Sequence, residues 1–406
     1  MTSVPAQLVD ALPQHRGHQG GLCPADSVVA RDGDNGRVER LLVLGAGAGQ
    51  LGLLSAARSR GLFVIAVDRD PGAPGFRHAD RRAIVSVEDE PALERLAEAE
   101  RIDGVIAPGS DWPVGPAARI AARLGLPHPI SPETAVLSTS KLRQRERLAE
   151  AGVPQTGWRV LSNPDEAVGL PALVRPPDRQ GRRARALVRS PRELQSAVRA
   201  ALRASRVGLA LVEELVAEPV VTVSGFCRGG IVHALTMSDR LPLATVWESE
   251  RGEGVPAVTA RAVEALGIRE GPVIVQLQIG AEGPRVLELA ARIGGGHDAE
   301  LCEGALGIDL NALALSTALG EDIEPWRLEP RWRAGGACIR FLDGEGEARR
   351  LEKAESVPGV EWVRVYGGSD RAGAVLAIGG SPAEALERAT RAAECVRFRA
   401  AHAQAL

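Results

Sequence analysis

The sequence has no long apolar run and few aromatic residues. Its 406 residues include one tyrosine, five phenylalanines and six tryptophans. No stretch approaches the roughly 20 apolar residues that a membrane-spanning helix needs, and the polar start of the chain lacks the hydrophobic core of a secretory signal. We therefore expect a cytoplasmic protein with no membrane partner.

Cysteine pairs and an excess of positive charge are also absent. The five cysteines are scattered, and none stands in a CxxC spacing. This gives no support to a zinc knuckle or a disulfide framework. The formal net charge is −3 with 25% charged residues, unlike a general phosphate-backbone binder. We expect reduced thiols and no nucleic-acid partner.

Lysine is scarce, although basic residues are not. Of 49 lysines and arginines, only Lys141 and Lys353 are lysine. A lysine that persists in a chain so biased toward arginine is a candidate for a position that needs a compact ammonium group. The alternative for Lys141 is a solvated charge on a helix surface.

The chain is long enough for two or three packed units. Residues 1–37 mix Gln, His, Gly, Pro and Asp without periodicity and predict a flexible tail. Residues 38–132 alternate strand and helix patterns, which predicts a doubly wound parallel sheet. A second unit with antiparallel strands follows over residues 133–330, and residues 331–406 form a smaller C-terminal piece. The predicted fold class is α/β, with an α+β arrangement in the second unit.

Several expected elements bear on a functional site. One helix is predicted from Pro132 to Ala151, carrying Lys141, and another from Ala299 to Leu319. Residues 83–87 predict a strand, and residues 220–237 predict a hairpin that turns at a Gly-Gly pair.

A glycine cluster follows the first predicted strand. Gly47, Gly49 and Gly52 have the GxGxxG spacing, and Asp68 ends the next strand. This is the dinucleotide fingerprint, in which the glycine turn approaches a pyrophosphate and the acid binds ribose. The same turn occurs where a Rossmann-like unit only packs or holds a substrate. An NAD(P)-dependent oxidoreductase is one hypothesis, although no pairing of a histidine with an acid stands out to handle the proton.

The segment 273–297 predicts two strands joined by a short turn. It places Gln276 and Glu288 among aliphatic neighbours, with Arg292 and a glycine run beyond them. Polar side chains in such surroundings need partners. Oxygen ligands on adjacent strands, followed by a cation and exposed amides, suit a magnesium ion that bridges two nucleotide phosphates. The alternative is a hairpin with Gln276, Gln278 and Glu288 on its solvent face.

The order of these motifs resembles that of the ATP-grasp superfamily, in particular its carboxylate-amine ligases and the related carbamoyl-phosphate synthase and biotin carboxylase branches. The resemblance runs from about Glu39 to Ala401. Lys141 is similar to the family's first nucleotide lysine, and the stretch 212–216 resembles the hinge strand that receives adenine. The stretches 275–277 and 287–292 resemble the paired metal-ligand strands.

The resemblance implies a domain organisation and a role for each candidate residue. Residues 38–132 would be a pre-ATP-grasp domain, residues 133–330 the ATP-grasp core with a small lid at about 155–215, and residues 331–406 a piece that completes the core. By this resemblance, Lys141, Arg175 and Gly181 would contact the phosphates of ATP, and Glu213, Glu214 and Leu215 would contact adenine. Gln276 and Glu288 would bind the metal ion, and Arg292 and Arg175 would be catalytic. Gly295, Gly296 and His297 would contact the substrate.

Four positions depart from the family pattern. Arg175 replaces the usual second lysine, and a guanidinium can still neutralise phosphate. The loop after it keeps one glycine, Gly181, where two are common, so backbone amides approach phosphates less freely. Val220 replaces a ribose-binding glutamate and Ala290 a metal-ligating asparagine. A catalytically degenerate member with a binding or regulatory role is a second hypothesis.

The resemblance implies an ATP-dependent ligase that joins a carboxylate to an amine through an acyl phosphate and releases ADP and phosphate. A carboxylate is a poor electrophile, and phosphorylation supplies a leaving group while the site excludes water. The expected cofactors are ATP and Mg²⁺, with Mn²⁺ as a substitute. The expected partners are a small carboxylate, an amine and a second copy of the chain in a homodimer.

Overall fold

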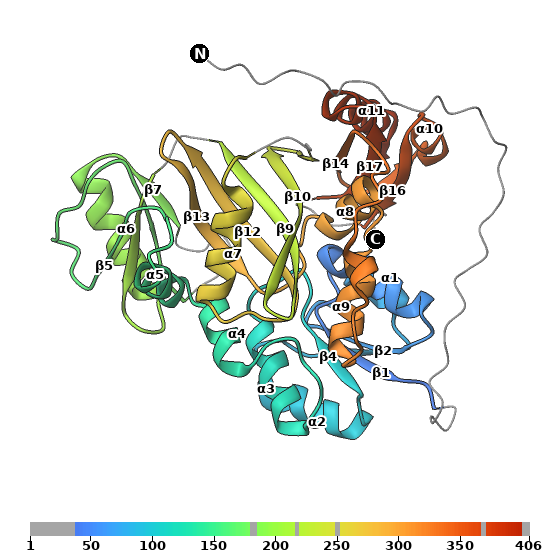
Figure 1. Ribbon diagram of the computed structural model, residues 1–406, viewed down its shortest axis with the longest axis horizontal. Coiled ribbons are helices and arrows are strands. Elements are labelled where there is room, and N and C mark those ends of the chain that lie inside the picture. The colour runs from blue at the N-terminus through green and yellow to red at the C-terminus, as the bar shows by residue number, and fades with distance from the viewer. Residues whose placement is uncertain (1–36, 179–184, 216–218, 248–251, 367–370, 400–406) are drawn as a thin grey trace, which may run out of the picture. The chain divides into compact units, whose positions relative to one another are not determined.

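The computed structural model describes residues 37–178, 185–215, 219–247, 252–366 and 371–399 (Figure 1). Apart from Arg37, the expected tail lies outside these ranges, and so does Gly181 of the expected phosphate loop. Within them, no helix combines the length and apolar character needed to cross a bilayer.

A parallel sheet forms the first part of the described chain, in the order β3-β2-β1-β4. The apolar runs 41–44 and 64–67 are fully buried because helices cover both faces of the sheet. This confirms the predicted doubly wound unit. Its elements are β1 (Arg40–Leu44), η1 (Ala48–Gln50), α1 (Leu51–Ser59), β2 (Phe63–Asp68), η2 (Pro74–His78), β3 (Arg81–Ile84), α2 (Glu90–Glu100), β4 (Gly104–Ile106) and α3 (Val114–Leu124).

The edge strand of this sheet differs from its prediction. It was expected at residues 83–87, but β3 begins at Arg81 and ends at Ile84. Ile84 is half exposed and β3 pairs with β2 alone among the described strands. An edge strand with little burial carries no hydrophobic alternation to mark its ends.

A small antiparallel sheet, the lid, follows in the order β5-β8-β6-β7. Helix α6 packs on it through Leu194, Val198 and Ala201, which recur on one face at helical spacing. Helices α4 and α5 lead into the lid. The bounds are α4 (Pro132–Thr139), α5 (Lys141–Glu150), β5 (Trp158–Leu161), β6 (Ala172–Arg175), β7 (Ala186–Val188), α6 (Pro191–Ala204) and β8 (Ala210–Glu214).

A large antiparallel sheet has the order β13-β12-β9-β10-β11-β14-β17-β16 among the described strands. The predicted hairpin is β9–β10, and Gly229 and Gly230 take the positive φ angles of its turn. The C-terminal strands continue the same sheet because β14 pairs with β11. Its strands are β9 (Val220–Arg228), β10 (Ile231–Leu241), β11 (Ala244–Trp247), β12 (Gly271–Gly280), β13 (Gly283–Ala290), β14 (Gly336–Leu342), β16 (Val360–Val365) and β17 (Gly373–Gly379).

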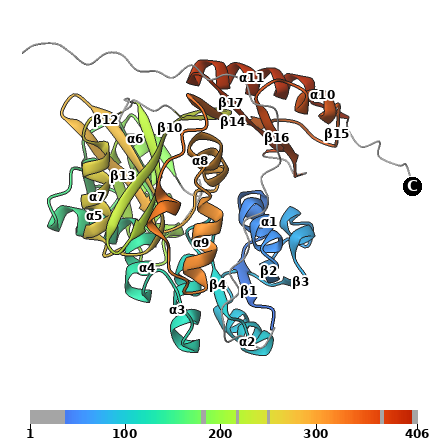
Figure 2. The same ribbon diagram turned by 45° about the vertical axis from the view of Figure 1, so that its right-hand side comes forward.

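Helices cover both faces of the large sheet. Phe226 packs with α8 and α9, whereas its neighbour Cys227 packs with α7, and successive strand residues point to opposite faces. Figure 2 shows α9 between this sheet and the parallel sheet, and α11 along the C-terminal strands. The remaining elements are α7 (Val255–Ala265), α8 (Asp298–Leu306), α9 (Leu310–Ala318), η3 (Pro325–Leu328), β15 (Glu347–Arg349), α10 (Leu351–Glu355), α11 (Pro382–Cys395) and β18 (Arg397–Arg399).

Both long helices predicted around the site are divided. Ser140 has extended φ and ψ, ends α4, and caps α5 by accepting from the Arg143 amide at 3.5 Å. Lys141 is therefore the first residue of α5 instead of a mid-helix residue. Gly307 ends α8 in the left-handed region, and Asp309 caps α9.

We expect Gly104→Ala to destabilise the contact between β4 and α9. A Cβ at Gly104 would lie 2.5 Å from the Ala318 carbonyl oxygen and 3.0 Å from Leu319 Cδ2. Such overpacking lowers the free energy of unfolding by about 1–3 kcal/mol. Urea denaturation should resolve this loss, whereas Gly169→Ala, where a Cβ meets no atom within 4 Å, should stay within about 0.5 kcal/mol of the wild type. Equal midpoints for the two variants would contradict the expectation.

Candidate active site

Helix α5 docks against strand β13 with a polar face. Lys141, Gln144 and Arg145 have the i, i+3, i+4 spacing that places side chains on one side of a helix. The Gln144 side-chain amide donates to the Leu289 carbonyl at 2.7 Å and accepts from the Leu289 amide at 3.2 Å. Arg145 donates to the Val286 carbonyl at 3.0 Å. These bonds satisfy the edge of β13 as a neighbouring strand would.

The same helix face joins the lid through a buried ion pair. Arg145 Nη2 lies 2.7 Å from Glu213 Oε1, and both side chains are 3% exposed. The second carboxylate oxygen of Glu213, Oε2, lies 2.6 Å from Arg175 Nε. Burial alone would raise the pKa of Glu213, but the two arginines lower it.

Glu288 receives cations from two elements. Lys141 Nζ is 2.8 Å from Glu288 Oε1, and Arg175 Nη1 is 3.9 Å from Glu288 Oε2. Burial would raise the pKa of this carboxyl, but the charges of Lys141 and Arg175, with a smaller effect of Arg292, lower it from 4.5 to about 2. The carboxylate is therefore ionised and positioned to share cations with an anionic ligand.

Gln276 and Glu288 lie directly opposite one another on β12 and β13. The strand register shifts immediately afterwards, so that Leu277 pairs with Val286, and this bulge leaves Leu287 unmatched. Cross-strand partners project to the same face, and both side chains line one cavity. Gln278 is fully buried, which rules out a hairpin with all three polar side chains in solvent.

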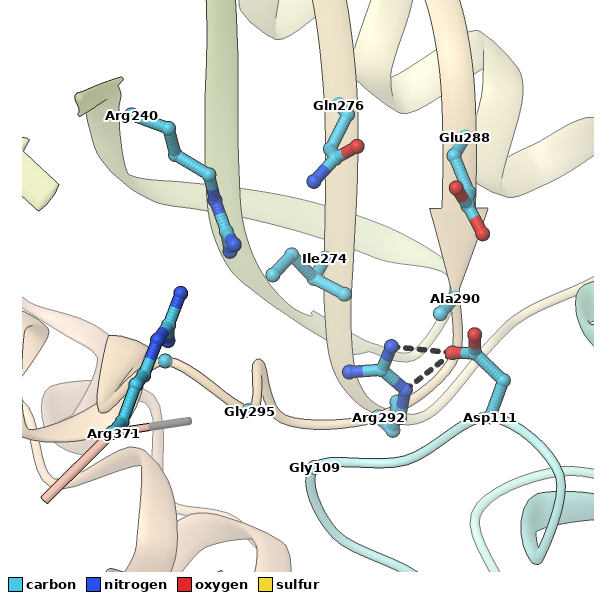
Figure 3. Close-up of a pocket in the computed structure, with 11 residues that line it drawn as sticks. Gly109, Asp111, Arg240, Ile274, Gln276, Glu288, Ala290, Arg292, Gly295 and Arg371 are labelled. Atoms are coloured by element: carbon cyan, nitrogen blue, oxygen red, sulfur yellow. Dashed lines mark hydrogen bonds and ion pairs between the residues drawn. The ribbon is translucent and has the colours of Figure 1, made fainter. Parts of the chain in front are cut away.

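The cavity has a volume of about 300 Å³ (Figure 3). Five of the predicted site residues line it: Gln276, Glu288, Arg292, Gly295 and Gly296. The other lining residues, none of which was among the predicted site residues, are Gly109, Asp111, Arg240, Ile274, Ala290 and Arg371.

Arg292 reaches the cavity from a loop instead of a strand. It was expected on the face of Glu288 in a continuing strand, but β13 ends at Ala290. Its guanidinium is held by Asp111, whose Oδ1 accepts from Arg292 Nε at 2.5 Å, and it also donates to the Ile293 carbonyl at 2.9 Å (Figure 3). Because the Arg292 guanidinium is hydrogen-bonded on two sides, it is a fixed positive charge at the cavity.

Two further arginines, Arg240 and Arg371, approach from the other side of the cavity. Figure 3 shows the side chains of Arg240 and Arg371 directed toward one another. Arg240 is oriented by Asp298 at 3.3 Å and by Thr222 at 3.1 Å, and Arg371 lies over the Phe341 ring at 3.7 Å. Asp111 could have been found from its place just after a parallel strand, where α/β sheets bind ligands. Charged residues after Arg240 in the sequence only hint at a charged ligand, and Arg371 has no comparable local signal.

The first glycine turn packs against the cavity loops. A Cβ on Gly49 would lie 3.0 Å from the Gly295 carbonyl oxygen, and one on Gly295 would lie 2.5 Å from the Gly109 carbonyl oxygen. Three backbone segments thus meet where a side chain has no room. The glycines serve this close approach.

The turn lacks the space and the acid that a dinucleotide would use. The Gln50 side chain lies over Gly45 and Gly47, within 3.1–3.4 Å of where their Cβ atoms would be, and donates to the Pro108 carbonyl at 2.8 Å. Asp68 accepts from the backbone amides of Ala46 at 2.9 Å and Asp70 at 3.0 Å. Both features therefore stabilise the turn itself, and they do not favour the NAD(P) hypothesis.

His297 lies outside the cavity lining, which corrects the expected side-chain contact with substrate. Its ring is buried, with Nδ1 3.1 Å from Glu300 Oε1 and Nε2 2.6 Å from the Tyr366 hydroxyl. Burial would raise the pKa of Glu300, but His297 and Arg364 lower it to about 2. His297 has φ +62° and is the N-cap residue just before α8, so its role is to hold the end of the glycine run.

The expected adenine segment lines a different cavity, of about 380 Å³. Glu213, Glu214 and Leu215 border it together with Trp158 and Pro171. The Glu213 carboxylate is occupied by two arginines, so the side chain itself is not directed into this cavity as an adenine acceptor. The Leu215 amide donates to the Pro171 carbonyl at 3.4 Å.

The parallel sheet, the lid and the large sheet together form the ATP-grasp fold, as the order of the motifs indicated. No family model matches the chain. Its relatives include formate-dependent phosphoribosylglycinamide formyltransferase from Burkholderia pseudomallei, which is 28% identical over 88% of this chain and 95% of that protein.

Solved structures share the fold along nearly their whole length. L-amino acid ligase from Bacillus licheniformis superposes with a TM-score of 0.75 at 20% identity, covering 90% of this chain and 100% of that one. N5-carboxyaminoimidazole synthetase from Staphylococcus aureus, complexed with ADP, gives a TM-score of 0.70 at 14% identity over 87% and 97% of the two chains. The chain therefore has the fold of ATP-grasp carboxylate-amine ligases.

We expect Glu213→Gln to destabilise the protein strongly. It would leave Arg145 and Arg175 buried beside an uncharged group, and breaking a buried ion pair by removing one partner costs about 3–5 kcal/mol. The neighbouring Glu214→Gln is the control, because Glu214 is 53% exposed and 3.7 Å from Arg285. Urea denaturation of both variants measures the difference, and a Glu213→Gln midpoint equal to that of the control would refute it.

The stabilising effect of the Glu288 carboxylate should depend on pH. Its pKa is 4.5 when unperturbed and about 2 in the fold, so its contribution is complete above pH 4.5 and disappears as the pH falls toward 2. We expect the gap in unfolding free energy between the wild type and Glu288→Gln to be smaller at about pH 3.5 than at about pH 6. Urea titrations of both proteins test this, and a gap that is independent of pH would oppose it.

Proposed function

We propose that the protein is an ATP-dependent ligase that joins a small carboxylate to an amine. The observation that carries the proposal is that Lys141 and Arg175 contact Glu288, which lines one cavity together with Gln276 and Arg292. Three fixed cations beside a paired amide and carboxylate suit a triphosphate and its metal ion. In this proposal residues 38–132 are the pre-ATP-grasp domain, residues 133–330 the core with its lid, and residues 331–406 the completing piece.

The phosphates of ATP would be held by Lys141 and Arg175. Both cations now contact Glu288, Lys141 at 2.8 Å and Arg175 at 3.9 Å. Phosphate oxygens arriving beside them would share their charge, as the carboxylate does. Adenine would lie along Glu213–Leu215, in the cavity that these residues border.

The donor atoms present fit a magnesium ion held by few protein ligands. Gln276 and Glu288 provide two oxygen-bearing side chains on adjacent strands, and Ala290 provides none. Across the described residues no group of three or more His, Cys, Asp or Glu side chains could hold a metal by itself. Magnesium typically keeps several waters and binds through one or two carboxylates plus phosphates. When bound, it would neutralise charge on the phosphoryl oxygens.

Arg292 would act on the carboxylate and on the acyl phosphate formed from it. The substrate carboxylate oxygen attacks the γ-phosphorus and ADP leaves, and then the amine attacks the acyl carbon and phosphate leaves. Asp111 orients the Arg292 guanidinium toward the charge that develops in these steps. Gly295 and Gly296 border the same space and allow the substrate to approach the backbone.

Lys141→Ala should remove the activity, and Lys353→Ala, the change at the only other lysine, should not. ADP release from Mg-ATP with panels of acids and amines measures turnover. We expect at least a roughly 100-fold loss for Lys141→Ala because the phosphates lose a positioned cation. Lys353 is exposed on α10, away from the cavity lining.

Two other outcomes would reject the proposal. ATP binding in a thermal-shift assay without ADP release for any pair would favour the degenerate binding protein, to which Val220 and Ala290 already point. A wild-type protein that binds no ATP would exclude both the ligase and the degenerate ATP-binding protein.

A further inference from the structure

Arg206, in the turn between α6 and β8 of the lid, contacts the parallel-sheet domain. Its guanidinium carbon lies 4.1 Å from the centroid of the Trp112 ring, and its Nη2 is 3.2 Å from Glu88 Oε2. Trp112 follows β4 and Glu88 follows β3, so both lie in loops beyond the carboxyl ends of parallel strands. One side chain thus joins the lid to the domain on which the cavity is built.

The backbone of the same turn is tied to the lid segment that carries Arg175. Asp178 Oδ2 accepts from the Arg206 amide at 2.5 Å and from the Val207 amide at 3.2 Å. Asp178 follows shortly after Arg175, which lies 3.9 Å from Glu288. The placement of Arg206 and the placement of the phosphate-binding arginine are therefore linked through one carboxylate.

Trp112 connects this contact to the cavity. It is next in sequence to Asp111, which holds Arg292 (Figure 3). Arg206 and Arg292 therefore contact neighbouring residues of a single loop. When the lid contacts Trp112, it therefore contacts the loop whose Asp111 orients Arg292.

We propose that Arg206 is a positioning residue that latches the lid onto Trp112 and Glu88, so that Arg175 stays beside Glu288 while Arg292 faces the cavity. This role rests on the proposed ligase function. The Arg206 side chain is 40% exposed and Glu88 is 52% exposed, and such contacts are weak, worth roughly ten-fold in the closing equilibrium. A weak latch suits a lid that excludes water while the acyl phosphate is present and opens to release product.

Hydrogen exchange of the full chain without nucleotide tests the latch directly. We expect the amides of the contact itself, in the turn at Arg206 and the loop that carries Trp112, to exchange roughly ten-fold faster in Arg206→Ala and in Trp112→Leu, with no further increase in the double variant. Arg206→Lys, which keeps the charge, should restore part of the protection. Arg203→Ala, an exposed change in the last turn of α6, should exchange as the wild type does. Thermal midpoints should be unchanged, since a latch acts on the lid and not on the core.

Two results would overturn the latch. One is wild-type exchange in Arg206→Ala, and the other is a double variant in which the two single effects multiply. Binding of a non-hydrolysable ATP analogue with magnesium provides the second readout, with an expected roughly ten-fold weaker affinity in Arg206→Ala but not in Arg203→Ala. A wild type that binds no analogue would reject the ligase function, whereas an Arg206→Ala affinity equal to the wild type would reject the latch alone.

Discussion

The docking of helix α5 against the edge of β13 is the interaction on which the site depends. An edge strand presents backbone groups that must find partners when they are buried. The Gln144 side chain hydrogen-bonds to the backbone amide and carbonyl of Leu289, and Arg145 donates to the Val286 carbonyl. The helix face that closes the sheet edge also carries Lys141, so the same contact places an ammonium group on Glu288. Through Arg145 and Glu213 it extends into the lid, and one buried charge network joins sheet, helix and lid.

The cavity is assembled from segments that are distant in sequence. The first glycine turn, the loop after β4 and the loop after β13 approach each other at Gly49, Gly109 and Gly295, where a Cβ would collide with backbone. This junction lies beyond the carboxyl ends of the parallel strands, where α/β sheets commonly bind ligands. A pattern that matches a dinucleotide fingerprint therefore serves here to bring three backbones together, and the cations and the carboxylate are arranged around that junction.

Much of this architecture could be predicted because it is local. Alternation and turn residues predicted the β12–β13 hairpin, and the scarcity of lysine drew attention to Lys141. The breaks at Ser140 and Gly307 carried readable capping signals, yet continuous helical periodicity favoured unbroken helices. The pairing of Asp111 with Arg292 could not be predicted, because the two residues are 181 positions apart and no periodicity connects residues at that separation.

The sequence by itself determined the alternating parallel-sheet unit, the ATP-grasp fold and the placing of Gln276 and Glu288 on the two strands of one hairpin. Only the tertiary structure decided which polar atoms face the cavity. The Glu213 side chain forms ion pairs with two arginines, and the His297 ring hydrogen-bonds to Tyr366. The Gln278 side chain is buried in the interior. The physical reason is that periodicity reports whether a residue is buried within its own element. The partner of a buried charge is supplied by another element, and its position exists only once the elements have packed.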